Sequence, residues 1–295
     1  MPGHQVCVFA VRDERMVMST LLHFPTPPRA TGFIVTIYGD AVEPRGGVLW
    51  MGTLVEACAE QGISESLVRT AVSRLVTAGK LVGERIGRKS YYRLTEAARS
   101  EFQEAARVLY LPPVEPTGWR VCLKAPAHLP AGWVAFGEGV AVAPDRQDVA
   151  PVSGPVLSGF VLSGAEELAG VMAQHWDFAP IMARYDIFLE MFSGLSDKLA
   201  QKAPLSGAAA LALRLRLVHH YRLAALADPR LPKSAWPANW PAPEARRIFV
   251  ESYLALAEAA DRHIGRSFHD SEGTLPDETP ATRQRLSSLT AEAGR

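Results

Sequence analysis

The stretch Gly62–Thr95, which reads GISESLVRTAVSRLVTAGKLVGERIGRKSYYRLT, decides the expected fold of this chain. Ser64 is a favourable N-cap, because its hydroxyl can accept a hydrogen bond from a free amide of the first helical turn. Apolar residues then recur at helical spacing and predict a helix with one buried face, formed by Leu67, Val68, Ala71, Val72, Leu75 and Val76. Gly79 is expected to end this helix as a C-terminal cap.

The opposite face of the expected helix carries short hydrogen-bonding side chains and arginines: Ser66, Arg69, Thr70, Ser73 and Arg74. Serine and threonine can bond base edges or phosphates, and arginine can bridge two acceptors of a guanine. This face therefore suits the major groove of DNA.

Two strands are expected directly after the helix, at Leu81–Arg85 and Ser90–Leu94, because the residues there alternate. The turn between them is short and basic, so its Arg88 and Lys89 can approach a phosphate backbone. From the start of the helix to the end of the second strand, seven basic residues stand against two acidic ones, while the whole chain has a formal net charge of zero. This local positive field favours nucleic acid, and the competing interpretation is a small helix–hairpin with ordinary solvated charges.

With 295 residues, 48% of them hydrophobic, the chain has room for two or three soluble domains. No apolar run approaches the roughly 20 residues of a membrane helix. Asp13 and Glu14 interrupt the N-terminal region, which argues against a signal peptide. The three cysteines, Cys7, Cys58 and Cys122, are scattered, which favours reduced thiols in a cytoplasm over a disulfide framework or a zinc site.

Two further helices are expected before Gly62. One begins at Ala30 and has a face formed by Phe33, Ile34, Ile37 and Tyr38, and Thr53 can cap the other. A turn rich in proline and glycine separates them. Helix, helix, short turn, helix and two strands is the order of a winged helix-turn-helix domain.

This part of the chain resembles the N-terminal domain of the PaaX family of bacterial transcriptional regulators. The matching runs are IYGDAVEPRGGVLWMGTL, GISESLVRTAVSRLVTAGKL and GRKSYYRLT, and the D-x-V-x-P-R-G-G pattern in the first is not a general helix-turn-helix feature. The resemblance returns in RYDIFLEMF, VHHYRLAALADPRLP and NWPAPEAR. The family usually has D-W-P-G in the last run, where Asn239 and Ala242 replace the acid and the glycine.

The chain is expected to have a mainly helical α+β fold with three domains. They are a winged helix-turn-helix domain at 29–111, a small α+β domain at 117–177 and a C-terminal helical domain for dimerisation and effector binding at 178–268. Residues 1–28 and 269–295 are expected to be poorly structured termini.

The family resemblance implies a ferredoxin-like middle domain. Its strands are expected at Trp119–Lys124, Val134–Ala143 and Val156–Leu162, with a helix at Ala165–Trp176. The family has a long helix between the first two strands. Here Ala125–Gly132 is too short for one and contains two prolines, so this domain is expected to be trimmed.

The resemblance also implies an effector of the aryl-coenzyme A thioester type, such as phenylacetyl-CoA. Its phosphates need cations and its ring needs aromatic partners, for which the candidates are Tyr185, Arg214, His219, His220, Arg222, Trp236 and Trp240. The competing interpretation is that the charged groups of these side chains lie in solvent while their aliphatic parts pack on the protein surface. Because adjacent histidines point in different directions, no metal site is expected, and no cofactor or catalytic residue is assigned.

The sequence thus predicts a cytoplasmic, homodimeric repressor that binds operator DNA of aromatic-acid (phenylacetate-type) catabolic genes. An acyl-CoA effector would release it, and neither enzymatic activity nor a membrane partner is expected. Two other functions stay open. An enzyme acting on a coenzyme A thioester would use His175, His219 or His220 and would turn over acyl-CoA substrates, whereas a winged-helix protein–protein adaptor would not retain DNA at low salt.

Overall fold

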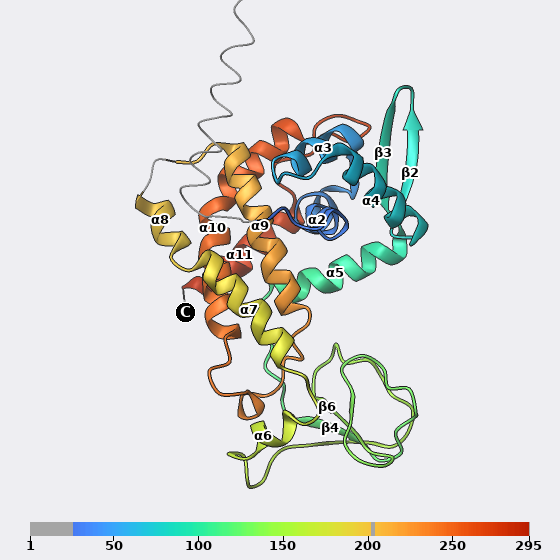
Figure 1. Cartoon of the computed structure of the whole chain (residues 1–295), viewed down its shortest axis with the longest axis vertical. Helices are drawn as coiled ribbons and strands as arrows, with labels where there is room; N and C mark the ends of the chain where they lie inside the picture. The colour runs from blue at the N-terminus through green and yellow to red at the C-terminus, as the bar shows by residue number, and fades with distance from the viewer. Residues whose placement is uncertain (1–25, 202–203, 295) are drawn as a thin grey trace, which may run out of the picture. The chain divides into compact units, whose positions relative to one another are not determined.

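The computed structural model describes residues 26–201 and 204–294, which form a mainly helical α+β protein with two small antiparallel sheets (Figure 1). The expected fold class is confirmed at this level. The expectation of a poorly structured segment at 1–28 lies almost wholly outside the described residues, as does Cys7.

The described residues form two compact units. The first combines the residues up to Pro112 with Ile187–Leu223 and the residues from Glu244 onward, and the second combines Pro113–Asp186 with Ala224–Pro243. This grouping differs from the three consecutive segments expected from the sequence, because the first unit joins the expected DNA-binding segment to most of the C-terminal helices.

The N-terminal part of the first unit alternates helices, turns and short strands. Its elements are α2 (Ala30–Ile37), the π-helical turn η1 (Tyr38–Val42), the 3-10 helix η2 (Glu43–Arg45), β1 (Val48–Trp50), α3 (Met51–Ala59), α4 (Glu65–Thr77), β2 (Leu81–Ile86), β3 (Lys89–Leu94) and α5 (Glu96–Tyr110). Helix α3 begins two residues before Thr53, whose side chain is buried, so Thr53 is not its cap as expected.

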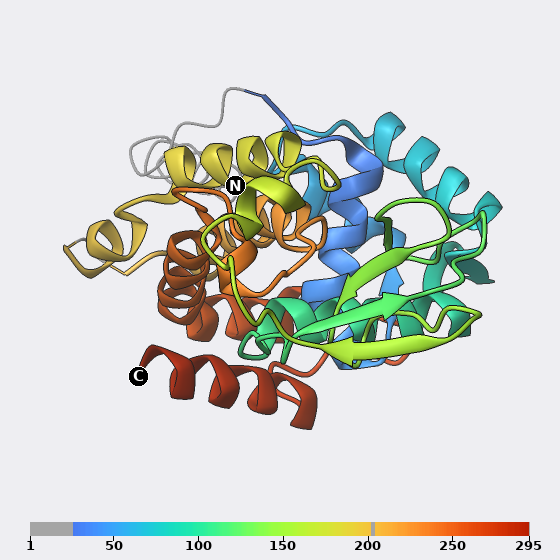
Figure 2. The same cartoon turned by 90° about the horizontal axis from the view of Figure 1, so that it is seen from below.

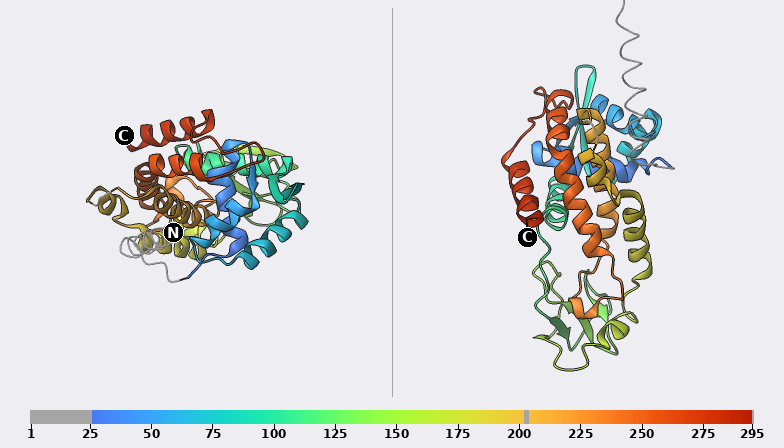
Figure 3. Two further views of the ribbon diagram at one scale, coloured as in Figure 1. Left: turned by 90° about the horizontal axis from the view of Figure 1, so that it is seen from above. Right: turned by 90° about the vertical axis from the view of Figure 1, so that its left-hand side faces the viewer.

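Helices α2, α3 and α4 pack against one another around the expected apolar face of α2, in which Phe33, Ile34, Ile37 and Tyr38 are all buried. The three strands pair antiparallel in the order β1-β3-β2. Leu81 pairs with Leu94 and Ile86 with Lys89, so β2 and β3 form a hairpin with a two-residue turn. The far end of this hairpin projects from the helices of its unit (Figure 3).

The C-terminal helices are α7 (Ala179–Phe192), α8 (Leu195–Gln201), α9 (Gly207–Ala225), α10 (Ala242–Ser267) and α11 (Pro280–Ala293). Aromatic side chains hold α9 to α10, because Tyr221 stacks on Phe249 with ring centroids 4.1 Å apart. Phe188 and Phe192 of α7 are fully buried in the same unit.

Helix α11 corrects the expectation of a poorly structured segment at 269–295. Thr279 and Thr282 form a capping box at its start, and Pro280 occupies its first turn, where proline is favourable. Leu289 is fully buried and α11 packs along α5 (Figure 2). The segment is polar in composition, but a few buried side chains are enough to fix it in the unit.

The second unit contains an antiparallel sheet of four short strands in the order β5-β6-β4-β7. They are β4 (Trp119–Cys122), β5 (Val134–Ala135), β6 (Ala141–Pro144) and β7 (Val156–Gly159), accompanied by α6 (Leu168–Met172) and the 3-10 helix η3 (Lys233–Ala235).

Two sequence expectations for this unit are wrong in detail. The strand expected at Val134–Ala143 is a hairpin, because Gly137 and Gly139 adopt positive φ and the amide of Phe136 donates to the carbonyl of Val140 at 2.8 Å. The helix expected at Ala165–Trp176 is α-helical only at Leu168–Met172, since it begins with tighter bonds between residues three apart.

Candidate nucleic-acid interface

Helix α4 begins and ends where the sequence indicates. Ser64 has the extended backbone of an N-cap (φ −69°, ψ 151°), although its hydroxyl lies 3.1 Å from the Ser66 hydroxyl and does not cap the helix. Gly79 has φ 67°, and the amide of Lys80 donates to the carbonyl of Leu75 at 2.9 Å. Glycine is suited to this left-handed cap because it has no Cβ.

The buried face of α4 is narrower than expected. Val68, Ala71, Val72 and Leu75 are buried, whereas Leu67 is 56% exposed and Val76 39% exposed. Each of these two lies next to a buried residue in the sequence, and successive residues of a helix turn by about 100°. Leu67 and Val76 therefore lie on the two flanks of the outward face.

The outward face of α4 presents all five side chains expected there, and each is exposed: Ser66, Arg69, Thr70, Ser73 and Arg74. The Thr70 hydroxyl donates to the Ser66 carbonyl at 2.9 Å. The Arg69 guanidinium forms an exposed ion pair with Glu65 at 2.6 Å. Such exposed pairs contribute little stability, so a phosphate or base can compete for this arginine.

The hairpin tip carries Arg88 and Lys89, both exposed, as expected. The Lys89 ammonium lies over the indole ring of Trp50, 4.7 Å from its centroid. Trp50 belongs to β1, and its amide donates to the carbonyl of His269 at 2.8 Å. The indole thus lies towards the tip end of the hairpin and positions Lys89, while Arg88 remains at the turn.

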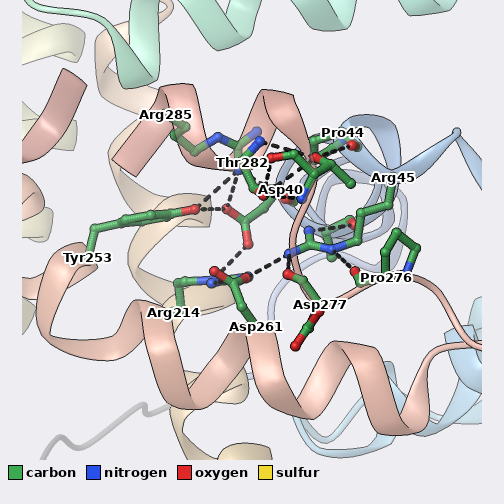
Figure 4. A network of polar contacts seen from close by, with 12 residues as sticks. Asp40, Pro44, Arg45, Arg214, Tyr253, Asp261, Pro276, Asp277, Thr282 and Arg285 are labelled. Atoms are coloured by element: carbon green, nitrogen blue, oxygen red, sulfur yellow. Dashed lines mark hydrogen bonds and ion pairs between the residues drawn. The ribbon is translucent and has the colours of Figure 1, made fainter. Parts of the chain in front are cut away.

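Asp40 forms the centre of a buried polar network in the same unit (Figure 4). Arg214 of α9 donates from Nε to its Oδ2 at 2.9 Å, and Arg285 of α11 donates from Nη1 to its Oδ1 at 3.2 Å. The hydroxyls of Tyr110 and Tyr253 donate to Oδ1 at 2.9 and 3.0 Å. One carboxylate in η1 therefore receives hydrogen bonds from α5, α9, α10 and α11.

The network is ionised at neutral pH. Burial by itself raises the pKa of the Asp40 carboxyl, but the charges of Arg214 and Arg285 and two tyrosine hydroxyls outweigh it, so this pKa lies below its usual range. Burial by itself lowers the pKa of Arg214, and the charge of Asp40 more than offsets that effect, leaving it above its usual value. Removing one partner would leave a buried charge uncompensated.

Arg45 makes a second link between η2 and the C-terminal part of the unit (Figure 4). Its Nη2 donates to Asp261 Oδ1 at 2.8 Å and to the Asp277 carbonyl at 2.9 Å, and its Nε donates to the Pro276 carbonyl at 2.7 Å. The aspartate and the arginine of the D-x-V-x-P-R-G-G run thus connect the N-terminal elements, which include α4, to the C-terminal helices.

Two family models match this chain. One, described as PaaX-like protein, matches residues 29–98, and the other, described as PaaX-like protein C-terminal domain, matches residues 176–266, so that together they cover more than half of the chain. The chain belongs to the PaaX-like family. The resemblance noted in the sequence is thereby confirmed.

One curated relative agrees with this assignment. The PaaX-like chain is 29% identical over 300 residues to the transcriptional repressor PaaX of Escherichia coli, with 90% of this chain and 92% of the repressor covered. Among solved structures it matches an uncharacterized protein from Mycobacterium tuberculosis with a TM-score of 0.39 and 21% identity, covering 72% of this chain and 89% of that chain.

The cationic effector candidates of this PaaX-like chain lie in the first unit and are engaged by the protein itself. Arg214 is fully buried in the Asp40 network. Arg222 donates to the Thr36 hydroxyl at 2.8 Å and to the Gly32 carbonyl at 2.9 Å. These bonds occupy donors that a phosphate group would need.

The two histidines on the same helix are uncharged at neutral pH. His219 Nδ1 lies 2.9 Å from the Thr36 hydroxyl, and burial, reinforced by the charge of Arg222, lowers the pKa of His219 to about 3. Burial likewise lowers the pKa of His220 to about 4, with a smaller effect of Arg216. Both side chains pack as neutral groups in α9.

The aromatic candidates of the PaaX-like chain lie in the second unit and contact one another. Tyr185 is buried, and its hydroxyl donates to Asp228 Oδ2 at 2.9 Å. The Trp240 ring lies edge-on to Tyr185 at 5.9 Å and to Phe178 at 5.5 Å. The Trp236 indole nitrogen donates to a main-chain carbonyl. The structure thus brings Tyr185 and Trp240 together, in a different unit from the two arginines and the two histidines.

No group of three metal-ligating side chains occurs in residues 26–201 and 204–294. Cys58 and Cys122 are buried free thiols, and burial raises the pKa of Cys58 to about 12. Among the described helices, none is long and apolar enough to cross a membrane.

Sequence reasoning missed the Asp40 network. Arg214 carried the one available signal, because it lies in the strongly apolar run LALRLRLV, where a charge needs a partner. The partners are 174 residues away for Asp40 and 47 for Asp261, so sequence spacing does not reveal them. Arg285 lies beyond both family matches.

Proposed function

We propose that this PaaX-like chain is a DNA-binding transcriptional regulator of the repressor type. In this proposal α2 to β3 form a winged helix-turn-helix, α4 enters the major groove and the β2–β3 hairpin is the wing. The sheet of the second unit would be a reduced ferredoxin-like module. The relationship to the Escherichia coli repressor supports a regulator over an enzyme.

The exposed face of α4 is the observation that carries the proposal. Short side chains alternate there with Arg69 and Arg74, and all of them are exposed. The helix rests on buried apolar residues behind, and the basic tip of the hairpin lies on the same unit. This combination matches the phosphate-binding and base-reading parts of a DNA-binding domain.

The proposal includes a homodimer and a palindromic operator. Two copies of the chain would place one α4 in each half-site, with half-site centres about 34 Å apart. The target genes would encode aromatic-acid catabolism of the phenylacetate type, as family membership suggests.

A thioester of coenzyme A, such as phenylacetyl-CoA, would release the regulator from DNA. Tyr185, Trp236 and Trp240 are the preferred candidates for its ring, because they gather in one aromatic cluster. Arg214, His219, His220 and Arg222 are less suited to its phosphates, since they are buried or engaged in the first unit. A ligand that binds one conformation better than another shifts the population toward it.

The DNA-binding part can be tested by fluorescence anisotropy with a duplex recovered from a random-sequence pool by the chain itself. A dimer that uses Arg74, Arg88 and Lys89 on phosphates, with Arg69 reading a base, would make about six phosphate contacts. It should then lose about 10³–10⁵-fold in affinity between about 50 and 200 mM salt. Affinity that does not change with salt would refute this electrostatic interface, and no retention of any duplex at low salt would favour the adaptor function.

Arg69→Ala gives the residue-level test. It should reduce the preference for the selected duplex over random DNA by about 10-fold or more, because the two hydrogen bonds from the arginine to one guanine are lost. Arg262→Ala is a matched control, because Arg262 is equally exposed (58%) and pairs with Glu258 four residues away, but lies on α10. Equal behaviour of the two variants would remove Arg69 from base recognition.

The effector can be tested by adding phenylacetyl-CoA to the preformed complex. Release of the duplex by the thioester, and its loss in Trp240→Ala while DNA binding persists, would support the aromatic cluster as the ring site. Unchanged release in that variant would exclude it.

A further inference from the structure

Leu67 is a large apolar side chain on the surface that faces DNA in the proposed function. It is 56% exposed, although the sequence pattern places it in the buried face of α4. The buried face of α4 is formed without Leu67, by Val68, Ala71, Val72 and Leu75. Leu67 is therefore not used for packing among the described residues and is available for contact with another molecule.

The position of Leu67 along α4 is favourable for contact with bases. It is the third residue of a helix that begins at Glu65, so it lies in the first turn. A recognition helix reaches base edges mainly with its N-terminal residues. Helical geometry places Leu67 beside Thr70 and Arg74 on one flank of the outward face, because residues three and seven apart share a side of a helix.

The polar side chains around Leu67 are partly occupied by the helix itself. The Thr70 hydroxyl donates to the Ser66 carbonyl at 2.9 Å, and the Thr77 hydroxyl donates to the Ser73 carbonyl at 3.1 Å. The Ser66 hydroxyl lies 3.1 Å from that of Ser64. Fewer free donors remain on this face than its sequence indicates, which leaves a larger share of recognition to apolar contact.

The major groove offers one apolar group for such contact, the C5-methyl of thymine. We infer that Leu67 is a specificity-determining residue that contacts a thymine C5-methyl in each half-site. Burying this methyl against an exposed leucine removes apolar surface of both from water, which favours thymine over cytosine or uracil at that position. Arg69, Arg74, Arg88 and Lys89 supply the positive charge that brings the phosphates close enough for this contact.

This inference rests on the proposed DNA-binding function. Its test replaces thymine by deoxyuridine, which removes only the C5-methyl, one position at a time in the duplex selected by the wild-type chain. At one thymine of each half-site, the replacement should weaken wild-type binding about fourfold to fifteenfold, the effect of one or two buried methyl groups. Leu67→Ala should weaken binding to the thymine duplex similarly and should no longer distinguish thymine from deoxyuridine.

Val76→Ala is the matched control. Val76 is also an exposed apolar residue of α4 (39%), but it lies in the last turn, away from the end that reaches the bases. This variant should keep the full sensitivity to deoxyuridine. Because Leu67 is exposed, its replacement should leave the far-UV circular dichroism and the urea midpoint unchanged. The deoxyuridine scan with the wild-type chain tests the inference without any variant.

The outcomes are distinguishable. Wild-type binding that is insensitive to deoxyuridine at every position, or a Leu67→Ala variant that keeps the sensitivity, overturns the role of Leu67 and leaves the DNA-binding proposal intact. Failure of the wild-type chain to select or retain any duplex overturns both.

Discussion

Replacing Asp40 with asparagine should destabilise the first unit more than any exposed substitution. The side chain keeps its size but loses its charge, and Arg214 and Arg285 then face an uncharged group inside the protein. Asp40 Oδ2 accepts from Arg214, while Oδ1 accepts from Arg285 and two tyrosine hydroxyls. An amide has one oxygen, so one of these sites would receive an NH₂ group against a donor.

The expected magnitude follows from what the substitution leaves behind. Breaking a buried ion pair by removing one partner costs about 3–5 kcal/mol. Arg214 retains Asp261 at 2.7 Å, and Arg285 retains the main-chain carbonyl of residue 40 at 3.0 Å. These remaining partners place the expected loss near the lower end, at about 3 kcal/mol.

Urea unfolding followed by far-UV circular dichroism at pH 7 measures this loss. For an m value of about 2–3 kcal/mol/M, the midpoint should fall by about 1 M or more with m unchanged. Glu104→Gln is the control, because Glu104 is exposed on α5 of the same unit, and it should change stability by less than about 0.5 kcal/mol. If Asp40→Asn behaves like this control, the buried network does not stabilise the unit.

The pH dependence gives an independent check. The pKa of Asp40 is lowered in the folded chain, so its contribution is fully present above the unfolded value of about 3.9 and is lost as the pH falls through the folded value. The difference in unfolding free energy between wild type and Asp40→Asn should therefore be constant from pH 7 to about pH 5 and shrink below about pH 4. A difference that persists unchanged into strong acid would contradict the assigned charge.

Two further predictions concern stability. His219 has a pKa of about 3 in the folded chain and about 6.5 in the unfolded chain. As the pH falls below about 6.5, the unfolded chain therefore binds a proton at His219 before the folded chain does. At pH 5 this should lower the free energy of unfolding by about 2 kcal/mol. His219→Gln should show a decline between pH 7 and pH 5 that is smaller than that of wild type by this amount in urea unfolding; equal declines would show that His219 titrates normally. Leu289→Ala should cost about 2–5 kcal/mol because Leu289 of α11 is fully buried, and a change below about 0.5 kcal/mol would mean that α11 is not held in the unit.

The local elements of the proposed DNA-binding region were predictable from sequence. Periodic apolar residues and Gly79 located α4, and alternation located β2 and β3 within one or two residues, because these signals depend on neighbours along the chain. The same signals failed at Leu67 and Val76. Periodicity identifies the apolar side of a helix but not how much of that side the rest of the protein covers.

The second unit shows a different limit. Its strands are short, so the sequence does not distinguish one continuous strand over Val134–Ala143 from two strands joined by a turn at Gly137 and Gly139. In the C-terminal segment, composition predicted disorder because it averages over residues, whereas a few buried side chains, among them Leu289 and Arg285, anchor α11.

The sequence by itself determined that this chain has a helix and hairpin suited to DNA and that it carries the runs of the PaaX-like family. Only the tertiary structure decided what Asp40, Arg45 and Arg214 do. As residues in a sequence, they are a turn aspartate and two cations that a phosphate could bind. In the folded chain they form ion pairs with one another and with Asp261 across 47 to 216 residues of sequence, because a charge taken out of water must find its counter-charge in space.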